Sequence, residues 1–328
     1  MTVSRVINGE SNVRPATRET VNAAIAELNY APNSAARTLA GAGQSRIGLL
    51  YSNPSAGYLS EFLVGSLDQA SKRDVQLIVE KCELGDHEIE VARHLIEGGI
   101  DGIVLPPPLC DSPELIRMLV EEEVPAVLVG SARPAEQLLA VSIDDQKAAH
   151  EMTRHVLSLG HRRIGFIGGN PTLQASADRF AGYRAALEEA GLPLDEALVA
   201  PGLFTYRSGL DAAEQLLDAA DPPTAIFASN DDMAAATVAA AHRRGLDVPG
   251  DLTVCGFDDT TLATTIWPEL TTIHQPIADM SRAAVEMLVA AVRRQETPPE
   301  DRHALLGFTL IRRQSDAAPR RRPRARSA

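Results

Sequence analysis

Six residues with side chains suited to holding a small polyhydroxyl molecule follow or neighbour predicted strands. They are Tyr58, Arg179, Phe204, Asn230, Asp258 and Gln275. Carboxylate, amide and guanidinium groups hydrogen-bond neighbouring hydroxyls, and an aromatic ring covers the C–H face of a sugar. Singly, each has a simpler explanation: Asp258 could cap a helix, Arg179 could pair with a helix carboxylate, and Phe204 could belong to the core. Their recurrence at the same end of successive strands favours a binding site.

The sequence lacks the common motifs of catalysis, metal binding and nucleotide binding. No GxxxxGK(S/T), GxSxG or HExxH pattern is present, and His150, His155 and His161 lack the spacing of a helical metal pair. The glycine-rich stretch 165–170, GFIGGN, is not a GxGxxG fingerprint, and close strand–helix packing explains it equally well. We therefore expect no enzyme activity, no cofactor and no bound metal.

From residue 46 onward, nearly continuous apolar runs alternate with helix-length segments, a pattern typical of parallel sheets buried on both faces. The predicted strands are 46–52, 75–81, 101–107, 125–131, 163–169, 224–230 and 252–258. A break near 141–145 divides them, so we expect an α/β fold with two doubly wound parallel-sheet lobes, with later elements near 271–276 and 305–311 crossing back. Ligands of such sheets bind beyond the carboxyl ends of the strands, here in a cleft between the lobes.

The charge distribution indicates a small basic module attached to a large acidic one. The net charge of the 328 residues is −13, yet residues 1–46 carry five arginines against three glutamates, which favours nucleic acid as a partner of this segment. The three cysteines form no pair at metal or redox spacing, which fits the reducing cytoplasm. Without a signal peptide or a membrane-length apolar run, we expect neither secretion nor a membrane partner.

The first 45 residues predict short helices that cannot be stable alone. In TVSRVING, Val3, Val6 and Ile7 share one face, and an amphipathic helix follows within 14–30. A third short helix is expected within 33–41. At the other end, residues 317–328 have no apolar period and predict a disordered basic tail, either simply solvated or assisting phosphate contacts.

Several segments in fixed order resemble bacterial transcription regulators of the lactose-repressor and galactose-repressor family. They include TVSRVING, TRETVNAAIAELNYAPN, ARTLAG, GHRRIGFIGG, DRFAGYRAAL, PTAIFASNDDMA, GLDVPGDLTVCGFDD and PELTTIHQP. The resemblance implies a partial helix-turn-helix headpiece, a hinge helix and a two-lobed core like that of periplasmic sugar-binding proteins. The expected boundaries are 1–32 for the headpiece, 33–45 for the hinge and linker, 46–316 for the core, and 317–328 for the tail. Within the core we expect a first lobe at 46–144 plus 277–305, and a second lobe at 145–272 plus 306–316.

The resemblance also implies roles for individual residues. The expected DNA-binding residues are Thr2, Ser4, Arg5, Asn8, Asn29, Tyr30, Asn33 and Leu39. Arg5 would contact a base edge in the major groove, and Leu39 would be the apolar wedge that enters a base step in the minor groove. The six residues of the predicted binding site match effector-contacting positions of the family. Arg14 departs from the small polar cap that many relatives carry before the proline.

The expected function is a dimeric repressor of a catabolic operon that binds a pseudo-palindromic operator under control of a sugar or glycoside. A solute-binding protein with a vestigial headpiece and a Rossmann-type enzyme are the alternatives. A purine effector also stays open, as does the direction of the response. Because the resemblance implies another helix upstream of Thr2, we expect the chain as written to bind operator poorly, either because translation starts before Met1 or because this is a headless form.

Overall fold

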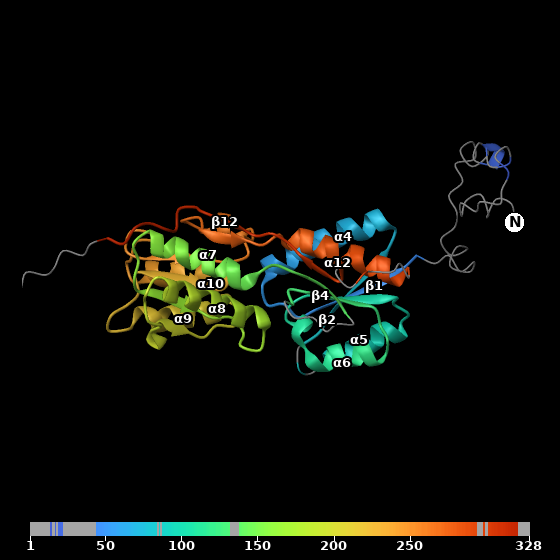
Figure 1. The fold of residues 1–328 in the computed structure, drawn as a ribbon, viewed down its shortest axis with the longest axis horizontal. Coiled ribbons are helices and arrows are strands. Elements are labelled where there is room, and N and C mark those ends of the chain that lie inside the picture. Colours follow the sequence, from blue (N-terminus) through green and yellow to red (C-terminus); the bar gives the residue numbers. More distant parts are fainter. Residues whose placement is uncertain are drawn as a thin grey trace, which may run out of the picture. The chain divides into compact units, whose positions relative to one another are not determined.

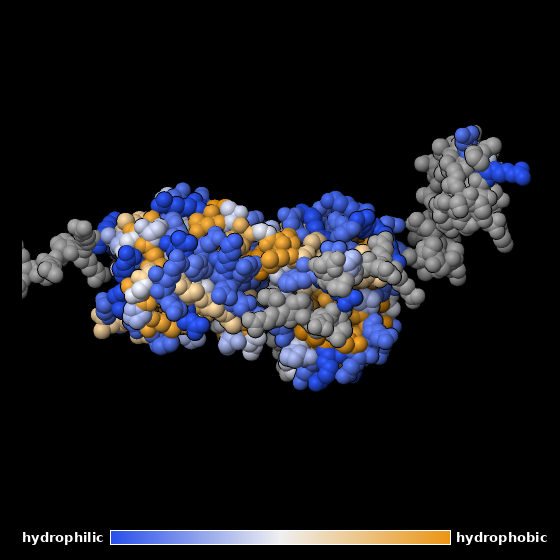
Figure 2. Space-filling view, viewed as in Figure 1, coloured by the Kyte–Doolittle hydropathy of each residue, from blue (hydrophilic) through white to orange (hydrophobic). Residues whose placement is uncertain are grey.

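The computed structural model describes residues 14, 17, 19–21, 44–83, 85, 87–131, 138–293, 298 and 301–320. The chain divides into two units, residues 1–44 and 45–328. The second unit contains two lobes, each with its own sheet, which lie side by side in Figure 1. Hydrophilic residues cover much of the face shown in Figure 2, with smaller hydrophobic areas in both lobes.

The first lobe is a parallel sheet in the order β11-β5-β4-β3-β1-β2, covered by helices on both faces. Its strands are β1 (Arg46–Tyr51), β2 (Gln76–Lys81), β3 (Gly102–Leu105), β4 (Ala126–Val129), β5 (Leu139–Ser142) and β11 (His303–Leu305). Its helices are α4 (Ala56–Arg73), α5 (Glu88–Glu97), the short η1 (Leu109–Asp111), α6 (Pro113–Glu121) and α12 (Ile277–Val292). Figure 1 shows α4 and α12 on one side of the sheet and α5 and α6 on the other.

Successive residues of the central strands fill cores on opposite faces of this sheet. In β4, Val127 and Val129 belong to the core that includes α4 and α12, whereas Ala126 and Leu128 belong to the core beneath α5 and α6. This alternation explains the continuous apolar run, because both faces of the strand are buried. The same expectation is wrong for β2, which among the described strands pairs only with β1 and is partly exposed.

The second lobe is a parallel sheet in the order β7-β6-β8-β9. Its strands are β6 (Ile164–Ile167), β7 (Val199–Ala200), β8 (Ala225–Ala228) and β9 (Thr253–Cys255). Its helices are α7 (Asp145–Ser158), α8 (Gln174–Glu189), the short η2 (Glu196–Leu198), α9 (Tyr206–Leu217), α10 (Asp231–Arg243) and α11 (Leu262–Thr265). Residues of α7 and α8 pack on one face of the sheet, and residues of α9 and α10 pack on the other.

Within the described part of the chain, the backbone passes between the lobes three times, at 142–145, 274–277 and 305–309. The later elements divide between the lobes: β11 joins the first sheet, while β10 (Thr272–His274) and β12 (Thr309–Ile311) form a separate antiparallel pair. The predicted run at 305–311 is therefore not one strand but parts of two. The confirmed fold class is α/β with two doubly wound parallel lobes.

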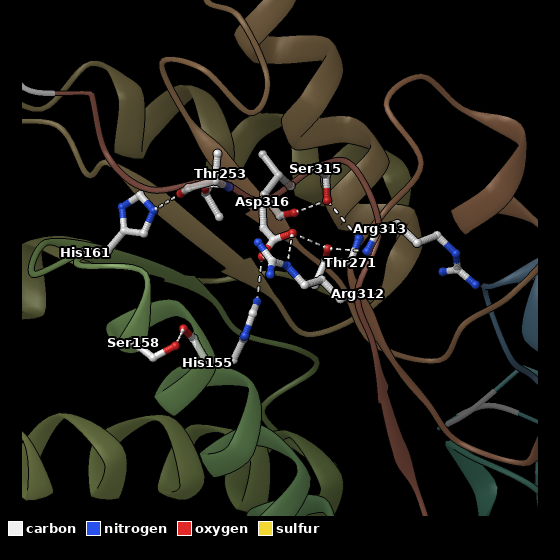
Figure 3. A network of polar contacts seen from close by, with 11 residues as sticks. His155, Ser158, His161, Thr253, Thr271, Arg312, Arg313, Ser315 and Asp316 are labelled. Carbon is white, nitrogen blue, oxygen red and sulfur yellow. Dashed lines mark hydrogen bonds and ion pairs between the residues drawn. The ribbon is translucent and has the colours of Figure 1, made fainter.

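A buried carboxylate, Asp316, anchors the segment after β12 on the second lobe (Figure 3). Its oxygens accept a hydrogen bond from Thr271 Oγ1 at 2.9 Å, and His155 Nε2 lies 2.6 Å away. Arg312 Nε adds an ion pair at 3.1 Å. Although burial raises the pKa of Asp316, the hydrogen bonds from His155 and Thr271 outweigh it, so this pKa lies below its usual value.

The structure differs from the expected disordered tail over residues 317–320. The Ala317 backbone N–H donates to Thr253 Oγ1 at 3.0 Å, its carbonyl oxygen lies 2.8 Å from His161 Nε2, and Arg320 pairs with Asp247 at 2.9 Å. Sequence periodicity could not reveal these contacts because the partners are far away along the chain. Residues 321–328 lie outside the described part.

Candidate functional site

The six predicted effector residues line a single cavity whose walls come from both lobes. They are Tyr58, Arg179, Phe204, Asn230, Asp258 and Gln275. The cavity has an empty volume of about 650 Å³, part of it open to solvent. Asn230 and Asp258 follow strands of the second lobe, as predicted, whereas Tyr58 and Arg179 project from helices α4 and α8.

A buried guanidinium organises the charged part of the cavity. Arg179 Nε donates to Asp145 Oδ1 at 2.7 Å, and its Nη1 donates to the Ser229 carbonyl at 2.5 Å. The same Nη1 lies 3.7 Å from Asp258 Oδ1, and Cζ lies 3.6 Å from the centroid of the Phe257 ring. Arg179 thus pairs with a helix carboxylate, as its simpler explanation expects, and it also lines the cavity.

Asp258 is a buried carboxylate whose hydrogen-bonding capacity is only partly used. Gln275 Nε2 donates to its Oδ1 at 2.6 Å. Burial raises the pKa of Asp258 to about 7, although Arg179 and Gln275 act to lower it. The backbone of Asp258 is in the left-handed region, with φ at 107°, a conformation that non-glycine residues rarely adopt outside functional sites. A ligand hydroxyl could donate to the remaining lone pairs.

The Phe204 ring is placed by its backbone and by a glycine. Phe204 has φ at 60°, and its carbonyl oxygen accepts a hydrogen bond from Asn230 Nδ2 at 3.1 Å. A Cβ at Gly169 would collide with the Phe204 ring, so only glycine leaves room for the ring there. Asn230 also caps α10, since its Oδ1 accepts from the Met233 N–H at 3.0 Å. These contacts fix an aromatic face beside the polar groups.

Tyr58 brings an unpaired hydroxyl to the cavity. Its side chain is buried, and among the described residues its Oη has no hydrogen-bond partner. Burial raises the pKa of Tyr58 well above its usual value, so the hydroxyl keeps its proton at neutral pH. Because an unpaired buried hydroxyl is costly, a ligand group that bonds to it would gain affinity.

Sequence reasoning missed several polar residues that also line the cavity. They are Asn53, Ser55, Asp145 and Asn170. Asn53, Ser55 and Asn170 follow β1 and β6, so the rule that identified Asn230 and Asp258 could have found them. Asp145 begins α7 directly after the helix cap Asp144, and nothing local distinguishes it from an ordinary residue of the first helical turn.

The two lobes also contact each other beside the cavity. Ser55 Oγ of the first lobe donates to Asp232 Oδ2 of the second at 2.6 Å. The Gln174 N–H at the start of α8 donates to Asp111 Oδ2 of the first lobe at 2.9 Å. Burial raises the pKa of both carboxyl groups, which indicates that the contacts lie partly shielded from water.

The expected DNA-binding residues Thr2, Ser4, Arg5, Asn8, Asn29, Tyr30, Asn33 and Leu39 all lie outside the described residues. Within the described part of the chain, no cluster of histidine, cysteine and acidic residues could hold a metal ion. None of the helices described is long and apolar enough to cross a membrane.

Two family models match the chain, one at its start and one across its second half. Residues 1–33 match "Bacterial regulatory proteins, lacI family", and residues 153–315 match "Periplasmic binding protein-like domain". The regulator CelR of Thermobifida fusca is 37% identical over 305 residues, covering 91% of this chain and 89% of CelR. Catabolite control protein A of Priestia megaterium is 34% identical over 298 residues, covering 90% and 89% of the two chains.

Solved structures give the same result. A complex of the transcriptional regulator CelR with cellobiose has a TM-score of 0.77 at 34% identity, covering 95% of this chain and 94% of that one. The lac repressor dimer bound to operator and an anti-inducer has a TM-score of 0.79 at 27% identity, covering 97% and 95%. Taken together with the two-lobed fold and its shared cavity, these matches show that the chain belongs to the lacI family of bacterial DNA-binding transcription regulators and is not an enzyme.

Proposed function

We propose that this regulator is a cytoplasmic repressor of a catabolic operon whose operator affinity is controlled by a neutral sugar or glycoside bound between its lobes. The observation that carries the proposal is the meeting of six polar and aromatic side chains from both lobes in one cavity. The carboxylate of Asp258, the amide of Asn230 and the hydroxyl of Tyr58 suit vicinal hydroxyls, and the Phe204 ring suits the C–H face of a sugar.

The charges in the cavity disfavour a phosphorylated effector. The described lining residues include two carboxylates, Asp145 and Asp258, but one guanidinium, that of Arg179. Because Arg179 already bonds to Asp145 and to the Ser229 carbonyl, these lining residues leave no free cation to neutralise a phosphate. The remaining carboxylate would repel it at short range. An uncharged sugar needs no neutralising cation and is not repelled by the carboxylate.

The similarity to the CelR–cellobiose complex supports a saccharide rather than a purine, since that relative binds a sugar and aligns over nearly the whole chain. For operator binding, the lacI-family match over residues 1–33 supports the DNA-contacting roles proposed for Thr2, Ser4, Arg5, Asn8, Asn29, Tyr30 and Asn33. Leu39, the proposed minor-groove wedge, follows that segment.

A homodimer is also part of this proposal. Val64 and Leu67 are 57% and 55% exposed on α4, three residues apart on one helical face. Large apolar side chains exposed together favour a protein interface. A dimer would have one DNA-binding segment for each half-site of a pseudo-palindromic operator. Sedimentation of the double variant Val64→Asp, Leu67→Asp should show a monomer where the unmodified chain is a dimer.

A thermal-shift screen of the full chain tests the effector class. The panel contains glucose, galactose, cellobiose, lactose, glucose 6-phosphate and guanine. A ligand at a hundred times its dissociation constant should stabilise the core by about 2.7 kcal/mol. We expect stabilisation by a neutral sugar, and stabilisation by guanine or the sugar phosphate alone would refute the proposed effector.

Two matched variants then locate the binding site. Asp258→Asn removes a charge from the cavity wall, whereas Asp259→Asn changes the next residue, which bonds to Arg313 and His274 and does not line the cavity. Hydrogen bonds to charged groups contribute about 1.5–3 kcal/mol, so calorimetry should show at least tenfold weaker sugar binding for the first variant. Equal affinities in both variants would contradict the assigned site.

A further inference from the structure

A run of arginines that follows the core has no part in the site between the lobes. Residues 320–326, RRRPRAR, contain five arginines and are called the basic segment below; no acidic side chain occurs within 317–328. The whole chain carries a net charge of −13, so the basic segment is a local exception to an acidic protein. Arginine runs of this density are typical of segments that contact nucleic-acid phosphates.

The structure holds the chain in place up to the first of these arginines. Asp316 is buried against the second lobe, and the Ala317 carbonyl oxygen lies 2.8 Å from His161 Nε2. Arg320 Nη2 then pairs with Asp247 Oδ2 at 2.9 Å, while the Arg320 side chain stays 63% exposed. The basic segment therefore begins at a fixed point on the surface of the second lobe.

That point lies at the edge of the second sheet opposite the cavity. His161 precedes β6 and Asp247 precedes β9, whereas the cavity residue Asp258 follows β9. Because these strands are parallel, residues before them and residues after them lie at opposite edges of the sheet. In the first lobe, β1 begins at Arg46, and the cavity residue Asn53 follows that strand. Figure 1 accordingly shows the start of β1 and the segment after β12 on opposite sides of the core.

Several acidic residues near this edge of the second lobe already pair with arginines of the lobe itself. Asp195 and Asp221 pair with Arg163 at 3.2 and 2.9 Å, and Asp218 pairs with Arg244 at 2.6 Å. The first arginine of the basic segment takes two further carboxylates next to it. The other four arginines of the segment thus find these carboxylates already neutralised, which favours a polyanion outside the lobe as their partner.

We propose that the basic segment binds the phosphate backbone of duplex DNA at the end of the core opposite the start of β1. The chain belongs to a family of DNA-binding regulators, so duplex DNA is the polyanion that it meets. Guanidinium groups pair with phosphate oxygens without reading the bases, and they displace counterions from the DNA. The segment would therefore add affinity that is independent of sequence and strongly dependent on salt. This inference goes beyond the proposed function, because it needs no effector.

Fluorescence anisotropy of the full chain with a duplex of random sequence tests the proposal over a series of salt concentrations. The segment variant carries Arg321→Gln, Arg322→Gln, Arg324→Gln and Arg326→Gln and leaves the described residues unchanged. Each phosphate contact adds about 0.9 to the slope of log affinity against log salt concentration, so the slope should become shallower by about 2–4. At about 50 mM salt, we expect the segment variant to bind the duplex at least about tenfold more weakly.

The matched control carries Arg154→Gln, Arg184→Gln, Arg207→Gln and Arg243→Gln, four exposed positions on helices of the second lobe. It changes the net charge by the same amount, so it separates contact by the basic segment from the effect of overall charge. Its DNA affinity and salt slope should stay close to those of the unmodified chain. Equal losses in both variants, or no loss in the segment variant, would overturn the proposal. A segment variant that loses binding only to single-stranded RNA or to acidic lipid vesicles would overturn it as well. Each of these results leaves the proposed sugar control intact, because sugar binding is not measured.

Discussion

Replacing Asp258 by Asn should make the core more stable at alkaline pH while weakening sugar binding. Asn keeps an oxygen for the Gln275 hydrogen bond and tolerates a positive φ, so the substitution removes the charge with little change of shape. What it abolishes is a buried carboxylate whose pKa is raised to about 7. A site that stabilises its ligand at the expense of the fold is expected where binding needs a buried charge.

The magnitude follows from proton linkage. A carboxyl group with a raised folded-state pKa costs no stability below its unfolded-state pKa. It destabilises the fold increasingly as pH rises above that value, and does so fully above its folded-state pKa. Raising the pKa of Asp258 from 3.8 to about 7 corresponds to roughly 4 kcal/mol at 1.36 kcal/mol per pH unit. The cost is absent near about pH 4, grows as pH rises, and is complete above about pH 7.

The assay compares thermal unfolding of the unmodified chain and Asp258→Asn between about pH 5 and pH 8, without ligand. Burial also raises the pKa of Asp145, Asp231 and Asp232, so the pH dependence of the unmodified chain alone combines several groups. The difference between the two proteins isolates Asp258. The advantage of the variant should widen toward pH 8, and a constant difference, or a loss of stability at pH 8, would refute the reasoning.

Three further predictions concern the shape, closure and anchoring of the core. Gly169→Ala should displace the Phe204 ring and weaken sugar binding in calorimetry without lowering the melting temperature by more than a few degrees; unchanged affinity would contradict the stacking role. Asp111→Ala removes the acceptor of the Gln174 N–H across the cleft. Sugar affinity should therefore fall about tenfold, although neither residue lines the cavity. X-ray scattering without sugar should show a larger radius of gyration. Asp316→Ala leaves Thr271 and His155 without their acceptor and should lower the unfolding free energy by about 1–3 kcal/mol in urea titrations, and an unchanged unfolding free energy would show that the network does not hold the segment in place.

The sequence predicted the strands that are buried on both faces, because their apolar runs are continuous. It did not identify β5, β7 or β11 as separate strands. β7 consists only of Val199 and Ala200, too short for a periodic signal. β11 joins the first sheet by pairing with β5, from which it is separated by the whole second lobe, and no local pattern encodes such a pairing.

For the candidate site, the rule that ligand groups follow strands brought together residues that do line one cavity. Asp145 was missed because it lies at the start of a helix, where aspartate is common for local reasons. The partnership of Asp145 with Arg179 depends on the packing of α7 against α8. This packing is a tertiary property, so spacing along the chain cannot reveal it.

Under the proposed function, sugar binding between the lobes controls operator affinity. Fluorescence anisotropy should measure the affinity of the full chain for an operator duplex selected from a random DNA pool, with and without a saturating concentration of the sugar found in the screen. We expect the sugar to change operator affinity at least about tenfold, and Asp258→Asn to shift this response to higher sugar concentration. The same operator affinity with the sugar bound and absent would contradict it.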